Sequence, residues 1–249
     1  MSKNNNSTGD WFESWFDSNY YHILYQHRDE AEAAFFLDNL IKELSISQNS
    51  SILDLACGKG RHAVYLNKKS FKVTGTDLSA ESIDFAKQFE NESLDFFVHD
   101  MREPVQERQF DFIFNLFTSF GYFEDLSDNL KVLKAVHSNL RQGGKLVIDF
   151  MNAKKVIRNL VLAERKTAGG IEFDIRRYVK NSFITKEIRF EDQGHFYNFE
   201  ERVRVLTLDD FTALFKESGF TLEKCFGNYA LENFDENNSD RLILIASPC

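Results

Sequence analysis

Three aspartates stand at equal intervals along the first half of the chain. Asp54, Asp77 and Asp100 each lie at or near the end of a short apolar run of the kind that forms a buried β-strand. The carboxyl ends of successive parallel strands meet at one edge of a sheet, and ligands of open α/β folds bind there. The spacing therefore predicts three carboxylates at a single ligand-binding edge.

A glycine-rich turn directly follows the first of these aspartates. In the segment LDLACGKGRHA, residues 53–63, Gly58 and Gly60 suit a backbone that takes positive φ or lies close to a ligand. With Ala63, the turn also satisfies the dinucleotide pattern Gly-x-Gly-x-x-Gly/Ala, and Asp77 then occupies the position of the ribose-binding acid. NAD(P), and with it an oxidoreductase, is therefore one candidate.

The three acids together favour a different ligand. Asp54 would repel a pyrophosphate, whereas it would attract a ligand that carries an ammonium or sulfonium group. Asp77 could accept both ribose hydroxyls, and Asp100 with Met101 could bind the amino group and the face of an adenine ring. This combination predicts a site for S-adenosylmethionine (SAM), an adenosine compound without phosphate.

The segments that position these residues alternate between strand and helix patterns. Strand patterns occupy 51–56, 71–76, 94–99, 110–115 and 145–150, and helix patterns occupy 28–44, 60–69, 80–90 and 127–140. Such alternation is typical of a parallel sheet with helices on both faces. Beyond residue 165, three further strand patterns at 171–178, 183–190 and 195–206 predict an inserted antiparallel meander. A helix at 208–218 and strands at 220–228 and 241–246 complete the sheet.

The sequence resembles the class I SAM-dependent methyltransferases over about residues 30–150, and its last segment matches their topology. In that family an acidic-x-Gly-x-Gly loop holds the methionine part of SAM, and LDLACGKGRHA matches this loop with Ala56 where many members have glycine. The acid in VTGTDLS and the Asp-Met pair in VHDM match the family's ribose and adenine contacts. The cofactor-binding residues that the resemblance implies are Asp54, Ala56, Cys57, Gly58, Gly60, Arg61, Asp77, Leu78, Asp100, Met101, Asn115 and Phe117.

The resemblance also implies the architecture. We expect an α/β, Rossmann-like, doubly wound sheet of seven strands, mostly parallel with an antiparallel C-terminal hairpin, plus the inserted antiparallel β meander. The expected division is a disordered tail at 1–10, a helical lid at 11–44, the SAM-binding core at 45–165, the insertion at 166–206 and the completion of the core at 207–249. The insertion would cover the substrate or form a homodimer contact.

Aromatic and polar residues outside the cofactor motifs are candidates for substrate contact. Tyr20, Tyr21 and His22 belong to an aromatic N-terminal segment that could fold over the cofactor or could simply pack as an aromatic helix. Phe120 and Tyr122 follow the fourth strand at the same predicted edge. A base for the acceptor's proton is sought among His22, His27, His62, Tyr20, Tyr21 and Tyr122, and no motif assigns it.

Composition limits the class of function. The formal net charge of −9 argues against broad contact with nucleic acid. The three cysteines are too few for a disulfide framework. No apolar run is long enough to cross a membrane, and the N-terminus lacks a signal-peptide pattern. We therefore expect a cytoplasmic protein without a metal centre.

The function expected is methyl transfer from SAM, which becomes S-adenosylhomocysteine (SAH), to an N or O atom of a small molecule. The acidic surface and the lack of a separate RNA-binding module favour a small molecule over a polymer. The alternatives are an NAD(P)-dependent oxidoreductase, a SAM-binding protein without catalysis, and a methyltransferase that acts on RNA or protein.

Overall fold

A computed structural model describes residues 11–25 and 30–249; the tail predicted at 1–10 and the candidate base His27 lie outside these ranges. The chain clusters into two compact units. The α/β unit comprises the described residues 30–155 and 206–249, and the β unit comprises 11–25 and 156–205. The domain boundaries expected from the sequence divide the chain differently, because they place the N-terminal helices and the insertion in separate parts.

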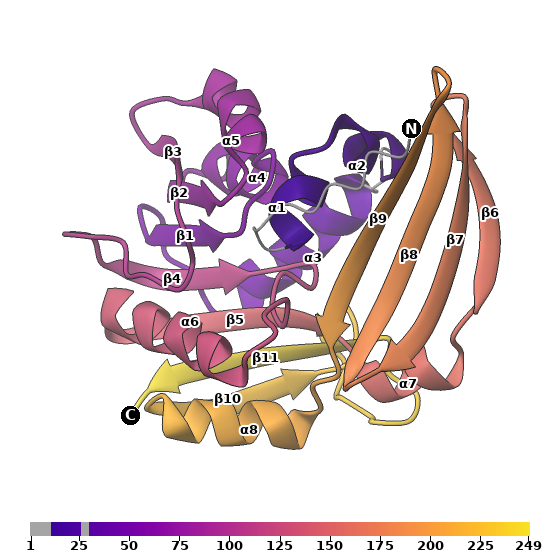
Figure 1. Cartoon of the computed structure of the whole chain (residues 1–249). Coiled ribbons are helices and arrows are strands. Elements are labelled where there is room, and N and C mark those ends of the chain that lie inside the picture. Colours follow the sequence, from indigo (N-terminus) through magenta and orange to yellow (C-terminus); the bar gives the residue numbers. More distant parts are fainter. Residues whose placement is uncertain (1–10, 26–29) are drawn as a thin grey trace. The chain divides into compact units, whose positions relative to one another are not determined.

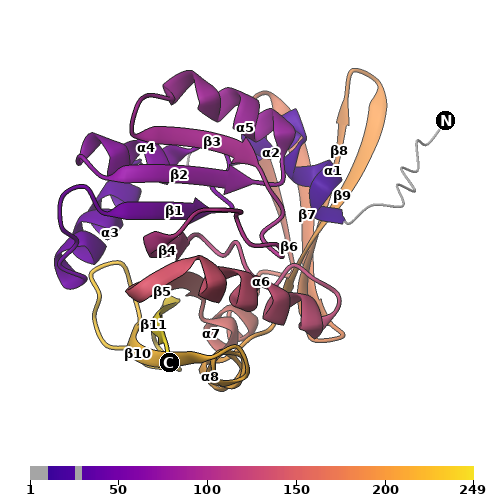
Figure 2. The same ribbon diagram turned by 90° about the vertical axis from the view of Figure 1, so that its left-hand side faces the viewer.

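The α/β unit contains a seven-stranded sheet in the order β10-β11-β5-β4-β1-β2-β3, drawn in Figures 1 and 2. The strands are β1 (Ser51–Leu55), β2 (Lys72–Asp77), β3 (Leu94–Val98), β4 (Phe110–Asn115), β5 (Leu140–Met151), β10 (Phe220–Phe226) and β11 (Arg241–Pro248). Neighbours among β1–β5 are parallel, whereas β11 is antiparallel to both β5 and β10. The predicted fold is therefore confirmed. Because β2 and β4 flank β1, the strand order reverses at β1, where ligands of such sheets bind.

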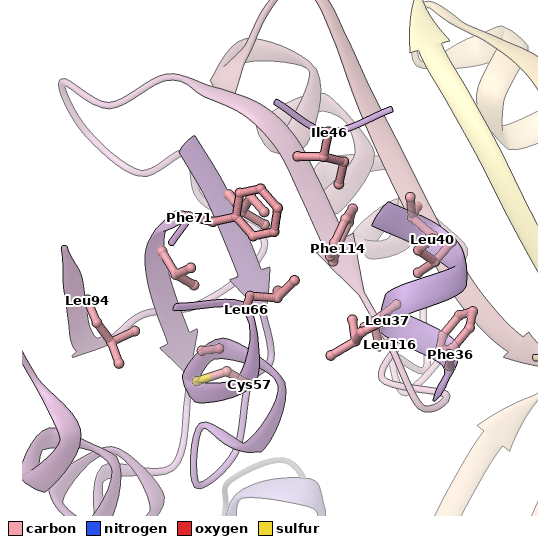
Figure 3. Packing of buried hydrophobic residues seen from close by; sticks show 14 of the residues in the cluster. Phe36, Leu37, Leu40, Ile46, Cys57, Leu66, Phe71, Leu94, Phe114 and Leu116 are labelled. Carbon is pink, nitrogen blue, oxygen red and sulfur yellow. The ribbon is translucent and has the colours of Figure 1, made fainter. Parts of the chain in front are cut away.

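One face of this sheet is covered by helices α3 (Glu30–Glu43), α4 (Arg61–Lys68) and α5 (Ala80–Ala86), which a 3-10 turn (Lys87–Phe89) extends. Their apolar residues recur at helical spacing and pack against the strands in one buried cluster, part of which Figure 3 shows. In this cluster Phe36 and Leu40 come from α3, Leu66 comes from α4, and Phe114 comes from the centre of the sheet.

A second group of packed aromatic side chains lies around helix α8 (Leu208–Glu217). The Phe211 ring lies 5.5 Å from that of Phe120 and 5.2 Å from that of Phe150 in β5. Helix α6 (Leu126–Asn139) contacts α8, and a short helix, α7 (Ala153–Arg158), follows β5.

A large ring in β3 explains why glycine occupies two positions next to it, Gly60 in the glycine-rich loop and Gly75 in β2. A Cβ at Gly60 would lie 2.7 Å from the Phe96 ring, and a Cβ at Gly75 would lie 2.4 Å from it. Neither position has room for a side chain while the ring is present. Phe96 thus fills the space that the two glycines leave, and it supports the loop from below.

The β unit is built on a second sheet, in the order β6-β7-β8-β9 and antiparallel throughout. Its strands are β6 (Ala163–Ala168), β7 (Ile171–Lys180), β8 (Phe183–Asp192) and β9 (His195–Arg204). The sequence predicts only three of them. Strand β6, with the sequence AERKTA, has an exposed side chain at every position but the last, so it carries no alternation of apolar and polar residues.

Two short helices pack on this second sheet. Helices α1 (Trp11–Phe16) and α2 (Asn19–Leu24) bury Trp15 and Leu24 against apolar residues of the strands, among them Phe173 and Phe190. Tyr20 lies with its ring 4.5 Å from that of Phe190. The aromatic N-terminal segment is therefore an integral part of the β unit.

A partly buried polar cluster crosses the same interface within the β unit. Glu201 accepts hydrogen bonds from Trp15 Nε1 at 2.7 Å and from the Tyr25 hydroxyl at 2.7 Å. Lys186 forms an ion pair with Glu201 at 3.5 Å and also contacts the Tyr25 hydroxyl. Burial outweighs the attraction of Glu201 and lowers the pKa of Lys186. Across residues 11–25 and 30–249, no helix is long and apolar enough to span a bilayer.

Candidate active site

The end of β1 places one carboxylate inside the α/β unit. Asp54 is 1% exposed, and its Oδ2 accepts a hydrogen bond from the Ala63 backbone N–H at 3.1 Å. That N–H belongs to the first turn of α4, whose N-cap residue, Gly60, has no side chain to offer. Burial raises the pKa of Asp54 to about 7, and nearby Asp77 adds to this effect. The site therefore holds a carboxyl group that gains or loses its proton near neutral pH.

The loop between β1 and α4 has a left-handed backbone at three positions. The φ angles are 61° at Ala56, 55° at Gly58 and 80° at Gly60. Alanine at the first position takes a conformation that costs about 1–2 kcal/mol for a residue with a Cβ. A Cβ built on Gly58 would meet no atom within 4 Å. The loop thus borders open space at Gly58, and a ligand can approach the backbone there.

Asp77, at the end of β2, holds this loop in place. Its Oδ2 accepts a hydrogen bond from Gly58 N at 2.7 Å, and its Oδ1 accepts one from Ser79 N at 2.9 Å. The neighbouring Cys57 N–H bonds the carbonyl of Thr76 in the same strand. Two of the three predicted carboxylates, Asp54 and Asp77, therefore meet at the glycine-rich loop.

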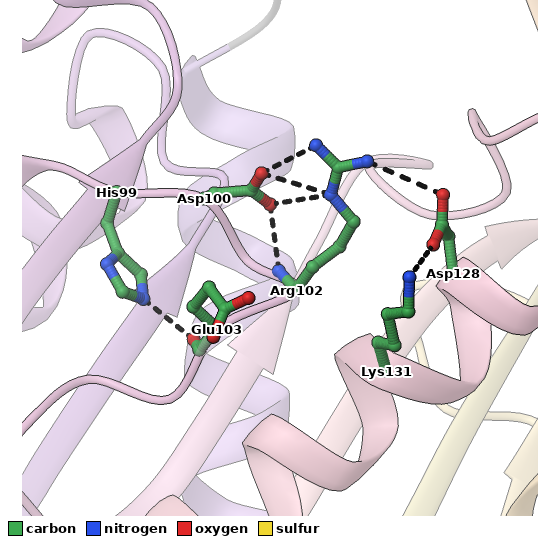
Figure 4. A network of polar contacts seen from close by, with 6 residues as sticks. All are labelled: His99, Asp100, Arg102, Glu103, Asp128 and Lys131. Carbon is green, nitrogen blue, oxygen red and sulfur yellow. Dashed lines mark hydrogen bonds and ion pairs between the residues drawn. The ribbon is translucent and has the colours of Figure 1, made fainter.

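Asp100, which follows β3, is engaged with an arginine that sequence reasoning did not select (Figure 4). The Arg102 guanidinium contacts both carboxylate oxygens, with Nη2 to Oδ2 at 2.6 Å. Arg102 also reaches Asp128 of α6 at 3.4 Å, and Lys131 pairs with Asp128 from the next turn of that helix. Burial acts to raise the pKa of Asp100, but the hydrogen bonds from Arg102 outweigh it, and the net pKa is lowered. The carboxylate is therefore held ionised and fixed in orientation.

Asn115, the last residue of β4, carries an unsatisfied acceptor. Its Nδ2 donates to the carbonyl of Leu55 at 3.1 Å and to that of Ser119 at 3.2 Å. Its Oδ1 is buried and has no hydrogen-bond partner among the described residues. A buried oxygen without a donor is costly, so it suits a ligand that donates a hydrogen bond.

After β4 the chain makes a turn in which two residues other than glycine take positive φ. Phe117 and Thr118 both have φ of 63°. Both backbone N–H groups bond to Asp149 of β5, to Oδ2 at 3.0 Å and to the carbonyl oxygen at 2.9 Å respectively. Asp149 is fully buried and forms an ion pair with Arg241 at 2.7 Å.

The Phe117 ring is part of a group of rings and cations beside the loop. The guanidinium carbon of Arg61 lies 4.8 Å from its centroid, and the rings of His62 and Tyr229 lie at 5.8 and 6.3 Å. Arginine can only donate, so His62 Nε2 is the acceptor in its contact of 3.1 Å with Arg61 Nη2.

The Tyr229 hydroxyl keeps its proton over the usual pH range. Burial, aided by the charge of Asp149, raises its pKa.

The predicted site residues fall into two groups. The α/β unit contains all the predicted cofactor residues, together with Phe120 and Tyr122. Phe120 is 1% exposed and packs on Phe211, and the Tyr122 hydroxyl donates to the carbonyl of Thr118 at 2.6 Å. Tyr20, Tyr21 and His22 belong to the β unit, where Tyr20 donates to Asp192. Contact between these five residues and a substrate stays a prediction.

Sequence reasoning missed four residues beside the site: Arg102, Asp149, Tyr229 and Arg241. Asp149 had the clearest signal, since an acid inside the apolar run LVIDF is out of place unless it is paired. Among the residues that the structure describes, no group of three or more His, Cys, Asp or Glu side chains could hold a metal ion.

Known proteins share sequence and fold with this chain. Residues 52–144 match the family model described as a methyltransferase domain. The putative methyltransferase YqeM of Bacillus subtilis is 36% identical over 117 residues, which cover 46% of this chain and 47% of that protein. A glycine/sarcosine/dimethylglycine N-methyltransferase of Actinopolyspora halophila is 24% identical over 250 residues, which cover 96% of this chain and 41% of that protein. The chain thus matches less than half the length of each of these two relatives.

A solved structure shares the fold. The crystal structure of an S-adenosylmethionine-dependent methyltransferase from Clostridium acetobutylicum gives a TM-score of 0.76 at 22% identity. The comparison covers 92% of this chain and 96% of that one.

Proposed function

We propose that this chain is a class I SAM-dependent methyltransferase, in keeping with the methyltransferase-domain match at residues 52–144, and that it transfers the methyl group of SAM to an amine nitrogen of a small molecule. The observation that carries the proposal is the combination of the buried Asp54, the unsatisfied Oδ1 of Asn115 and the open space at Gly58. These three features border the loop that follows β1, where the sheet reverses its order. The methyltransferase-domain match covers the glycine-rich turn and therefore favours SAM over NAD(P) as its ligand.

The chemistry of this loop fits the amino-acid end of SAM. Asp54 supplies a negative charge and Asn115 supplies a carbonyl oxygen, so each favours an ammonium group over a phosphate. Gly58 leaves its backbone accessible. SAM, when bound, supplies an electrophilic methyl group. The lone pair of a neutral amine forms the new N–C bond as the S–C bond breaks, SAH leaves, and the methylated ammonium gives up its proton to solvent.

The remaining contacts are assigned by position. Asp77 would bind the ribose hydroxyls, and its bond to Gly58 N would keep the loop in the form that accepts the methionine part. Asp100 would accept from the adenine amino group through the lone pairs that Arg102 leaves, with Met101 against the ring. Phe117 would lie beside the sulfonium, which aromatic faces attract.

One observation favours nitrogen as the acceptor. The relative from Actinopolyspora halophila is named for N-methylation of glycine and its methylated forms. We assign no general base, because His62 Nε2 and the Tyr122 hydroxyl are both engaged in hydrogen bonds.

The first test is isothermal titration with SAM, SAH and NADH in parallel, followed by detection of SAH after incubation with SAM and a panel of amines and alcohols. We expect SAM and SAH to bind, NADH to give no heat, and SAH to accumulate only with amines. Asp77→Ala should weaken SAH binding, whereas Asp95→Ala, a matched change in the neighbouring strand, should leave it unchanged. NADH binding, or turnover with alcohols alone, would contradict the proposal.

A further inference from the structure

The turn after β4 adopts a conformation that its own residues do not favour. Phe117 and Thr118 are consecutive and both have φ of 63°. Residues with a Cβ occupy this region at a cost, and threonine is branched at that carbon. Such a turn persists only where its surroundings impose it.

One buried residue holds both amide groups of the turn. Asp149 accepts from Phe117 N through its carboxylate and from Thr118 N through its own carbonyl. It is fully buried, so no water competes for these bonds. The turn therefore depends on the placement of a single aspartate in β5.

Arg241 of β11 fixes that aspartate and reaches the turn itself. Its Nε donates to Asp149 Oδ1 at 2.7 Å, and its Nη2 donates to Thr118 Oγ1 at 3.0 Å. The Tyr229 hydroxyl adds a weaker contact to Asp149 Oδ2 at 3.3 Å. The carboxylate is thus held from two sides while it holds the turn.

The turn presents the Phe117 ring to the glycine-rich loop. The ring lies under the guanidinium of Arg61, the first residue of α4, at 4.8 Å. The charge of Arg61 in turn acts on Asp54 and opposes the rise of its pKa. A change in the turn would therefore move one wall of the loop in which the ligand is proposed to bind.

We propose that Asp149 and Arg241 are positioning residues for SAM binding: their ion pair holds the left-handed Phe117–Thr118 turn that forms this wall. The inference rests on the proposed function, since it concerns the same site. Neither residue touches the proposed ligand. Each acts through the backbone that it holds.

The test compares SAH affinity, by isothermal titration, with unfolding measured on the same samples. Asp149→Asn keeps the shape but turns one acceptor into a donor that faces either Phe117 N or Arg241. We expect SAH binding to weaken by about tenfold or more. Thr118→Gly in the Asp149→Asn background should restore affinity to within about threefold, because glycine adopts positive φ without assistance.

Asp111 offers a matched control at the opposite end of β4. It pairs with Arg141 at 2.9 Å and also accepts a backbone N–H, that of Ser51. Asp111→Asn should lower stability and leave SAH affinity within about twofold of the native value. The control separates a general loss of stability from a change at the turn.

Arg241→Lys is the second route if Asp149→Asn does not fold. It retains the buried positive charge but loses the bond to Thr118 Oγ1, and its weaker SAH binding should also recover with Thr118→Gly. Native affinity in both single variants, or a loss that glycine does not reverse, would overturn the inference. If the native protein binds no SAH, that result would instead contradict the proposed function itself.

Discussion

The raised pKa of Asp54 predicts how strongly the affinity for SAH depends on pH. Burial raises this pKa to about 7, so in the protein without ligand the carboxyl group is about 1% ionised at pH 5 and about half ionised at pH 7. If the ammonium of SAH binds only the ionised form, affinity follows that fraction. The association constant should therefore rise about 50-fold from pH 5 to pH 7, equivalent to about 2.3 kcal/mol.

The sign follows from proton linkage. A cation beside the carboxylate lowers its pKa in the complex, so binding releases a proton and becomes stronger as pH rises. At pH 6 about 0.9 of a proton should be released for each SAH bound. Isothermal titration in two buffers of different ionisation enthalpy measures this number directly, alongside the affinity.

Asp54→Asn supplies the control. The amide cannot titrate, so its SAH affinity should be weaker than that of the native protein at pH 7 and nearly constant between pH 5 and pH 7. A native affinity that changes by less than about threefold over this range would refute the reasoning. So would an equally steep dependence in the asparagine variant, because another group would then be responsible.

Two further predictions concern stability. Gly60→Ala should lower the free energy of unfolding by about 2–4 kcal/mol, because its Cβ would lie 2.7 Å from a buried ring, whereas Gly58→Ala should cost only about 1–2 kcal/mol since its Cβ meets no atom within 4 Å. Urea unfolding measures both, and equal losses would contradict the packing argument. In the β unit, Glu201→Gln should cost about 1–3 kcal/mol by leaving the partly buried Lys186 without its counter-ion, and a second substitution in that variant, Lys186→Met, should recover most of the loss. Both tryptophans of the chain lie in α1, so their fluorescence follows this unit, and additive losses in the double variant would argue against the pairing.

The parallel part of the fold was predictable because its signals are local. Strands β1 to β5 are apolar runs separated by helical patterns, and a right-handed crossover leaves few ways to connect them. Asp54 and Asp77 follow from the same logic, since a residue at a strand end is placed by the strand. Strand β6 was not predicted because AERKTA is paired along its whole length but is almost entirely exposed.

The turn at Phe117 and Thr118 had no local signal. Sequence patterns mark positive φ by glycine or asparagine, and neither residue belongs to these types. The conformation comes from Asp149 and Arg241, which lie on strands far along the chain and meet only when β11 pairs with β5. Such a site is set by tertiary contacts, so a single sequence cannot reveal it.

The pairing within the β unit has a consequence for synthesis on the ribosome. Trp15 bonds Glu201, a partner 186 residues further along the chain. At a typical elongation rate of about 5–20 residues per second, the aromatic helices α1 and α2 would wait roughly 10–40 s for the strands that bury them. During that interval they would expose rings such as Trp15 and Phe16 on the nascent chain. Until the sheet is complete, these rings therefore lack the apolar surface that covers them in the folded unit.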